Sequence, residues 1–215
     1  MTRSPTPSLP RSRCRTGPDA TRRALLGAAL ALPLTGLLPR DAVALTEAAA
    51  AALVQRVVSD INRVIASGRT GSALYSDFER IFASYSDVRV IAGSVLGPVA
   101  RTLSSSQQTA FIAAFQGYMA RKYGRRFTEF KGGTVEVSRT VPVNNYVEVQ
   151  SVARLPGRSP IDVSFLVSDR DGQNRFFDIR IEGVSLLRTE RDEIGVMLDQ
   201  RQGNIDRLIA DLRTL

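Results

Sequence analysis

The chain has 215 residues, of which 43% are hydrophobic and 23% charged, with 29 lysines and arginines against 21 aspartates and glutamates. These proportions are those of a folded globular protein, and they exclude a chain that is disordered throughout. Because the sequence has no histidine and one cysteine, it excludes a Ser-His-Asp or Cys-His nucleophile, a histidine-ligated metal and an internal disulfide.

The formal net charge of +8 is concentrated near the N-terminus. Residues 1–44 carry seven arginines and two aspartates, a net charge of +5, whereas residues 45–215 carry 22 basic and 19 acidic residues, a net charge of +3. The basic balance therefore belongs mostly to the N-terminal segment. It gives little support to nucleic-acid binding by the rest of the chain, and we expect none.

The first 44 residues have the order of an export signal. A polar, basic stretch ends at Thr21-Arg22-Arg23, residues 24–38 are almost entirely apolar, and Ala42-Val43-Ala44 matches a small-x-small cleavage site. Fifteen residues are short for a bilayer span, which favours a cleaved signal over a retained membrane anchor. The paired arginines resemble a twin-arginine signal and favour that route over general secretion. We expect a mature chain from Leu45 and a periplasmic location.

The spacing of apolar residues predicts helices in the first part of the mature chain. Thr46 is expected to cap a helix that ends at Gly68, a second helix covers about 72–85, and a short segment covers 87–96. Ser104 and Gln107 have the spacing of a capping box for the longest helix. That helix carries aromatic residues at steps of four and extends to Gly132-Gly133.

After residue 133 the apolar period changes to two, which predicts strands. Alternation is clear around 135–137, 147–151, 161–167 and 177–181, and Asp171-Gly172 is typical of a hairpin turn. Two helices follow, around 190–200 and from Asn204. The predicted fold over 45–215 is therefore a single α+β domain, a four-stranded antiparallel sheet with one apolar face packed against helices.

Residues with the spacing of a catalytic or metal site are scarce. Asp178 and Glu182 share a strand face but stand about 13 Å apart, too far for a catalytic carboxylate pair. Arg180 lies between them, which favours a solvated charge ladder. Asp169 and Asp171 are turn residues and make a weak cation site at most. Since the sequence also has no phosphate-binding or dinucleotide-binding glycine motif, we expect no enzyme activity, no metal and no cofactor.

A basic cluster lies in the second half of the longest predicted helix. It consists of Arg121, Lys122, Arg125 and Arg126. The simplest interpretation is a solvated helix face. The functional alternative is contact with a lipid head group or an anionic partner, for which Arg121, Arg125 and Arg126 are the candidate residues.

The aromatic residues are the most distinctive part of the composition. All 14 phenylalanines and tyrosines lie after residue 44. A wide apolar helix against an apolar sheet is most often a filled core, but the same pattern suits a core held open for an apolar ligand. The residues expected to line such a pocket are Phe111, Phe115, Met119, Tyr123, Phe127, Val147, Val149, Phe165, Val167, Phe177, Ile179 and Ile181.

Two blocks of the sequence have an unusual order of residues. The first contains Val95-Leu96-Gly97, Ser104, Gln107, Phe111, Phe115, Tyr123, Phe127 and Phe130. The second contains Asp171-Gly172, the run from Phe177 through Glu182-Gly183-Val184-Ser185 to Leu186, and Arg191. In order and spacing, both blocks resemble the MlaC-type (toluene-tolerance) periplasmic phospholipid-binding proteins, and the resemblance covers nearly all of 45–215.

This resemblance implies both a fold and a function. The fold is NTF2-like, with an internal apolar pocket for lipid acyl chains. The function is that of a carrier that shuttles phospholipid between an outer-membrane lipoprotein complex and an inner-membrane ABC transporter complex, as an auxiliary component of that transporter. Such a carrier supports outer-membrane lipid asymmetry and solvent tolerance, and we expect it to act as a monomer.

Other functions stay open at the level of sequence. Val99-Ala100 and Asn174 stand where the family often has bulky aromatic residues, so a polycyclic lipid such as a hopanoid is an alternative cargo. A cofactor-free enzyme of the same fold would need a buried acid or tyrosine, and Tyr118, Tyr123 and Tyr146 are the candidates by type. A periplasmic adaptor with a filled core and no ligand is the third alternative.

The paired arginines give the first testable prediction. Replacing Arg22 and Arg23 with lysine should block export, because the twin-arginine route depends on that pair. The measurement is the amount of processed protein in the periplasmic fraction, together with the N-terminal sequence of the mature form, expected at Leu45. Unchanged export of the variant would contradict the twin-arginine route.

Overall fold

The structure is a computed structural model that describes residues 45–127 and 132–215. The predicted export signal and its cleavage site fall on residues 1–44, outside the described residues. The side chain of Phe127 and all of Phe130 also lie outside them. Among the described residues, no helix has both the length and the apolar content needed to cross a bilayer.

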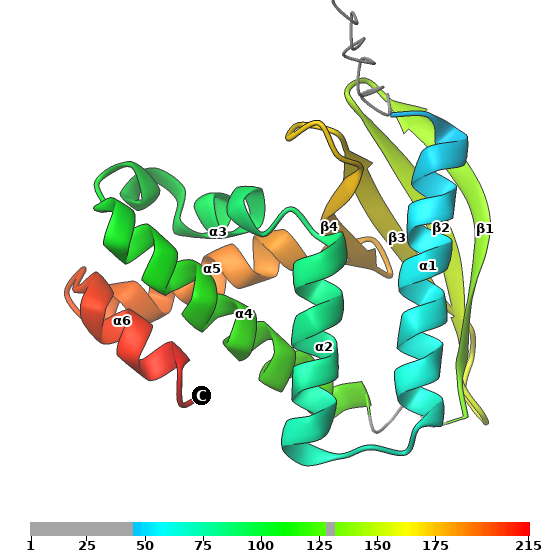
Figure 1. Ribbon diagram of the computed structural model, residues 1–215, viewed down its shortest axis with the longest axis horizontal. Helices are drawn as coiled ribbons and strands as arrows, with labels where there is room; N and C mark the ends of the chain where they lie inside the picture. Colours follow the sequence, from blue (N-terminus) through cyan, green and yellow to red (C-terminus); the bar gives the residue numbers. More distant parts are fainter. Residues whose placement is uncertain (1–44, 128–131) are drawn as a thin grey trace, which may run out of the picture. The chain divides into compact units, whose positions relative to one another are not determined.

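Two helices, α1 (Glu47–Ala66) and α2 (Gly71–Tyr85), form the first layer and lie side by side (Figure 1). The side chain of Thr46 accepts a hydrogen bond from the backbone N–H of Ala49 at 3.0 Å, so the predicted cap is confirmed. The apolar positions of α1 that recur every three to four residues are buried. This periodicity turns one face of α1 toward the interior.

The next helices are α3 (Val88–Leu96), the short 3-10 helix η1 (Gly97–Arg101) and α4 (Ser105–Phe127). The capping box before α4 is confirmed, because Ser104 Oγ accepts from the N–H of Gln107 while Gln107 Oε1 accepts from the N–H of Ser104, each at 3.2 Å. The N-terminal end of the longest helix is therefore fixed by two local hydrogen bonds.

Five strands form one antiparallel sheet in the order β1-β2-β3-β4-β5. Their bounds are β1 Thr134–Val143, β2 Tyr146–Arg154, β3 Ile161–Ser168, β4 Arg175–Ile181 and β5 Val184–Ser185. The predicted α+β class and the antiparallel meander are confirmed. The sequence pattern missed β5, because a strand of two residues is too short to show an alternation.

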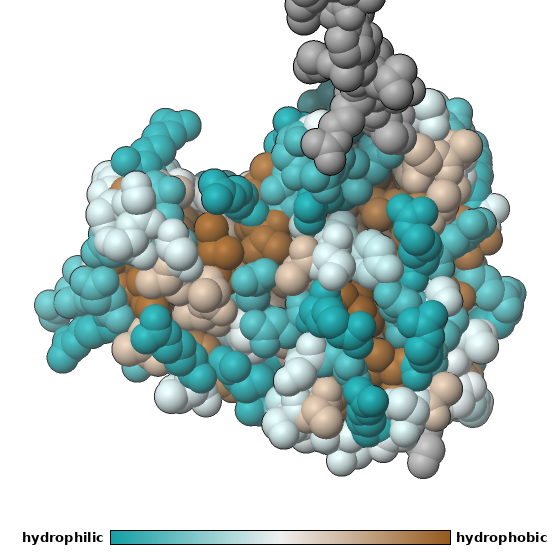
Figure 2. Space-filling model, in the orientation of Figure 1, coloured by the Kyte–Doolittle hydropathy of each residue, from teal (hydrophilic) through white to brown (hydrophobic). Residues whose placement is uncertain are grey.

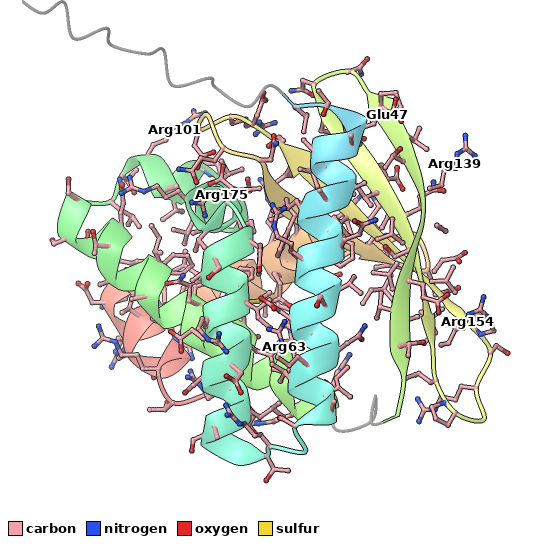
Figure 3. The ribbon with its side chains drawn as sticks, turned by 45° about the vertical axis from the view of Figure 1, so that its right-hand side comes forward. Glu47, Arg63, Arg101, Arg139, Arg154 and Arg175 are labelled. Carbon is pink, nitrogen blue, oxygen red and sulfur yellow. The ribbon has the colours of Figure 1, made fainter. Side chains whose placement is uncertain are left out.

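One face of the sheet packs against α1 and α2, and the other carries charged residues. Val149 and Val167 on the inner face are 0% exposed. Arg139 and Arg154 project on the side of the sheet away from α1 (Figure 3), and Arg154 lies 3.9 Å from Glu136. The alternation read from the sequence therefore places the buried valines on one face and residues such as Arg139 and Arg154 on the other.

Two helices end the chain, α5 (Leu186–Asp199) and α6 (Ile205–Leu212). The start of α5 was predicted near residue 190, which is four residues too late. Ser185 Oγ accepts a hydrogen bond from the N–H of Arg188 at 3.1 Å and caps the helix directly after β5. The last helix begins after Asn204 as predicted, with the side chain of that residue as its cap.

The buried apolar residues form two clusters instead of one. The first, the sheet cluster, lies between the sheet and α1 and α2; the second, the helical cluster, lies among α3, α4, α5 and α6. Figure 1 shows the sheet and α1 at the right and α3, α4, α5 and α6 at the left. Helix α4 takes part in both, since Phe111 belongs to the helical cluster and Ala120 to the sheet cluster.

Helices α2 and α4 pack closely at Gly124. A Cβ atom at this position would lie 2.8 Å from Cδ1 of Tyr75 and 3.6 Å from Cδ2 of Phe78. The ring of Tyr75 therefore occupies space that any side chain at 124 would need. Gly195 in α5 is a useful contrast, because a Cβ there would meet no atom within 4 Å.

This contrast predicts opposite effects of the same substitution. Gly195→Ala should stabilise the protein by up to about 1 kcal/mol, the usual helix preference of alanine over glycine. Gly124→Ala should destabilise it by about 1–3 kcal/mol, because the new methyl group displaces the ring of Tyr75. Urea unfolding of both variants measures the difference. Equal stabilisation by both would show that α2 and α4 do not pack as closely as described.

Candidate functional site

The apolar face of the sheet is fully covered at one end and half covered at the other. At the covered end Val147, Val149, Phe165 and Val167 are at most 4% exposed. At the other end Ala153 is 2% exposed, but several apolar residues around it are only partly buried, and Ile181 is 37% exposed. We call this second group, Val135, Val137, Val163, Ile179 and Ile181, the half-covered wall.

The strand register joins these residues into one surface. Val137 pairs with Ser151, Ser151 pairs with Val163, and Val163 pairs with Ile181 across successive strands. Paired residues of neighbouring strands point to the same face of a sheet, with Cβ atoms about 5 Å apart. The residues of the half-covered wall therefore share one face of the sheet, with Ser151 between those of β1 and that of β3.

A single hydroxyl group lies within this apolar surface. Ser151 is 2% exposed, and its Oγ atom has no hydrogen-bond partner among the described residues. A buried polar group without a partner costs about 1–3 kcal/mol of folding free energy. The oxygen atom is itself buried, so a ligand on the wall would reach it only after the neighbouring side chains move.

The structure divides the predicted pocket residues between the two clusters. Val147, Val149, Phe165 and Val167 belong to the sheet cluster, and Ile179 packs against it. Phe111 and Phe115 belong to the helical cluster, and Met119 packs against that cluster. The two groups were expected to face each other across a pocket, and the structure does not bring them together.

The first part of α4 packs among helices and not against the sheet, and this explains why the two groups of residues do not face each other. The rings of Phe111 and Phe115 are 0% exposed and stack on each other with centroids 5.7 Å apart. They pack against α3, α5 and α6, so this part of α4 completes a filled core of helices. The periodicity of α4 gave its apolar side correctly but could not say which elements would cover it.

A β-bulge changes the face on which Phe177 lies. The register between β3 and β4 shifts after Leu166, so that Phe176 pairs with Val167 and is 4% exposed in the sheet cluster. Phe177 is half-buried and packs edge-on against Tyr146, with ring centroids 5.6 Å apart. The prediction that Phe177 lines the interior is therefore wrong, because the bulge gives that position to Phe176.

The prediction of a solvated charge ladder on β4 is wrong for Asp178. This residue is 7% exposed and accepts hydrogen bonds from the hydroxyl of Ser185 at 2.7 Å and from the N–H of Leu187 at 2.9 Å. The carboxylate therefore ties β4 to the first turn of α5. Arg180 extends toward Glu148, with a separation of 3.7 Å.

A polar cluster formed by Lys122, Tyr123, Glu190 and Glu193 links α4 with α5. The carboxylate of Glu190 is 1% exposed and accepts hydrogen bonds from Nζ of Lys122 and the hydroxyl of Tyr123, each at 2.6 Å. Lys122 also pairs with Glu193. Tyr123 was expected to line the apolar pocket; its ring is half-buried, and its hydroxyl donates to one oxygen of a buried carboxylate.

The predicted basic cluster on α4 is divided among several partners. Arg121 donates to the carbonyl of Leu212, and Arg125 donates to the carbonyl of Leu215 at 3.2 Å. Arg121 thus binds the last residue of α6 and Arg125 binds a residue just after it, at the helix end where the dipole favours positive charge. Arg126 is exposed. A contact of these residues with a head group or an acidic partner stays a prediction.

The polar cluster predicts a loss of stability in alkali. Burial lowers the pKa of Lys122, but hydrogen bonds to Glu190 and Glu193 outweigh it and raise the pKa above the ordinary 10.5. Burial and the hydrogen bond to Glu190 raise the pKa of Tyr123 above 10.0. The contribution of both groups to folding is therefore fully present below their ordinary pKa values and falls as the pH rises through the raised values.

Urea unfolding between about pH 8 and about pH 11 measures this decline. In the double variant Lys122→Met, Tyr123→Phe the free energy of unfolding should be lower near neutral pH and should decline less steeply than in the parent. Tyr146→Phe is the control and should decline as the parent does. If the free energy of unfolding declined equally with pH in all three proteins, the decline could not be attributed to Lys122 and Tyr123.

Comparisons with known proteins give the family and confirm the fold. A family model described as "MlaC protein" matches residues 52–214. A solved structure of a phospholipid-binding protein from Ralstonia solanacearum, in complex with a phospholipid, is similar with a TM-score of 0.61 and 19% sequence identity. The match covers 76% of this chain and 98% of that chain, so the mixed helix and sheet fold extends over the whole neighbour. The chain therefore belongs to the MlaC protein family.

Proposed function

We propose that this protein is a periplasmic lipid carrier that binds the acyl chains of phospholipid with its single domain, residues 45–215. The observation that carries the proposal is the match in fold to a protein of Ralstonia solanacearum that is described as phospholipid-binding and in complex with a phospholipid. Membership of the MlaC family supports the same function, since it points to a binding and transport protein and away from an enzyme.

The half-covered wall is the proposed binding surface for the acyl chain. Its residues lie on β1, β3 and β4, and it continues into the buried end of the sheet through the pairing of Ile179 with Phe165. Each buried methylene contributes about 0.8 kcal/mol, so a chain of about sixteen carbons gains on the order of 12 kcal/mol before the costs of binding. Apolar burial is therefore sufficient to hold the cargo without a charged site.

The proposed cycle needs partners on both membranes. Phospholipid would pass between an outer-membrane lipoprotein complex and an inner-membrane ABC transporter complex, with this protein as the carrier between them. A chain that is deeply buried leaves slowly, so a partner must open the wall to release it. Tyr118 and Tyr123, which a cofactor-free enzyme would need as acids, are hydrogen-bonded to Glu193 and Glu190, which supports the carrier over the enzyme.

The direct test is the lipid content of the protein purified from the cell envelope. Native mass spectrometry and lipid extraction should find about one lipid per chain, with phospholipid expected and a polycyclic lipid identifying the alternative cargo. A protein that carries no lipid in any preparation contradicts the carrier and supports the ligand-free adaptor. Turnover of the bound molecule would instead support an enzyme.

A matched pair of substitutions tests where the lipid binds. Val149→Trp overpacks the covered end of the sheet and should cost about 1–3 kcal/mol of stability. Val163→Trp places the same ring on the half-covered wall, where it should leave the stability of the delipidated protein unchanged or higher while the bound lipid falls. Thermal melts and lipid content per mole measure both effects. Loss of stability with full lipid content in Val163→Trp would contradict the proposed wall.

A further inference from the structure

A surface hollow lies against α3, η1 and α5, and its lining is distinct from the half-covered wall. Its volume is about 510 Å³. Its lining residues are Arg89, Val90, Gly93, Ser94, Gly97, Pro98, Ala100, Arg101 and Arg191. We call it the arginine hollow. Figure 2 shows the surface hollowed over α3, and Figure 3 labels Arg101 on the segment that follows α3.

Small residues give the arginine hollow its depth. A Cβ atom at Gly93 would meet no atom within 4 Å, so this position of α3 faces open space. A Cβ atom at Gly97 would lie 3.0 Å from Nη2 of Arg191, which shows that the guanidinium group of α5 lies directly against the backbone of Gly97. The structure thus brings together two residues, Gly97 and Arg191, that lie far apart in the sequence.

The charge of the arginine hollow is not neutralised by its surroundings. Its lining contains three arginines and no acidic residue. None of these arginines forms a side-chain hydrogen bond or ion pair with another residue in the described ranges 45–127 and 132–215, in contrast to Arg121, Arg125 and Lys122 on α4. A concave surface with three unpaired guanidinium groups concentrates positive potential and attracts an anion.

We propose that the arginine hollow binds the phosphate group of a phosphate ester. Guanidinium groups match phosphate oxygens with forked, charge-assisted hydrogen bonds, and three of them suit a group that carries more than one anionic oxygen. The volume lies in the range of small-molecule sites, about 300–1,000 Å³, and Val90, Pro98 and Ala100 leave room beside the phosphate for a small organic substituent. A docked protein would instead need a larger and flatter surface.

This phosphate group has two possible sources, a lipid head group at a membrane surface and a soluble phosphate ester. The proposal does not depend on the carrier function, because the arginine hollow shares no residue with the half-covered wall. The two failures are therefore distinguishable: lipid content tests the carrier, and phosphate binding tests the hollow.

Titration calorimetry of the full mature protein with glycerol 3-phosphate tests the soluble source. Flotation with vesicles of phosphatidylglycerol, compared with vesicles in which sulfoquinovosyl diacylglycerol supplies the same negative charge without a phosphate group, tests the membrane source. The double variant Arg89→Ala, Arg101→Ala should weaken binding by about tenfold or more, the loss expected when charge-assisted hydrogen bonds are removed. Arg191→Lys should weaken it as well, since an ammonium group keeps the charge but lacks the forked geometry.

The matched control is Arg207→Ala, Arg213→Ala, which removes the same charge from exposed positions of α6 and the residue after it. It should bind as the parent does, and lipid content should be unchanged in all variants. Binding to either probe that is lost only in the hollow variants supports the proposal and identifies the source. Equal losses in hollow and control variants, or no binding by the parent, would overturn it. Binding of an acidic peptide but of neither phosphate probe would also overturn it.

Discussion

The arrangement of the two clusters depends on the hydrogen bonds that Lys122 and Tyr123 donate to the buried carboxylate of Glu190. Removing a carboxylate from water is costly unless it is paired, and here Lys122 and Tyr123 of α4 provide both charge and hydrogen bonds at 2.6 Å. Helix α5 follows β5 directly, and Asp178 ties its first turn to β4. The pairing of α4 with α5 therefore fixes where the helical cluster stands relative to the end of the sheet. Loss of either partner would leave a buried charge and loosen that junction.

Local patterns predicted most of the fold, because they record interactions within a few residues. Thr46, Ser104 and Asn204 each cap a helix through a bond to a residue three positions later, and strand alternation follows from the pleat. The errors came from longer-range geometry. The early start of α5 depends on the pairing of β4 with β5, and the separation of the two clusters depends on which helices cover α4. Neither interaction leaves a periodic signal in one sequence.

The apolar character of the candidate site could be predicted from the sequence, but the arrangement of its residues could be predicted only in part. Alternation identified the apolar face of the sheet, including Val163 and Ile179, but it assigned Phe177 to that face because a bulge has no sequence signal of its own here. The aromatic residues of α4 were assigned to the same interior on the assumption of a single core. The arginine hollow was missed altogether, because Arg101 and Arg191 come together only through the packing of α3 and the adjoining η1 against α5.

The two edge strands, β1 and β5, determine whether a strand of another chain can pair with this sheet. After two residues β5 turns into α5, so little backbone is exposed beyond β4. At the opposite margin β1 contains an irregularity between Val137 and Arg139, and it contains Pro142, which has no N–H to donate. Both margins therefore resist extension by an added strand, which is a common route to aggregation and to peptide capture. A protein that exposes apolar surface gains from this protection, because a chain that docks on this sheet would have to recognise side chains instead of backbone.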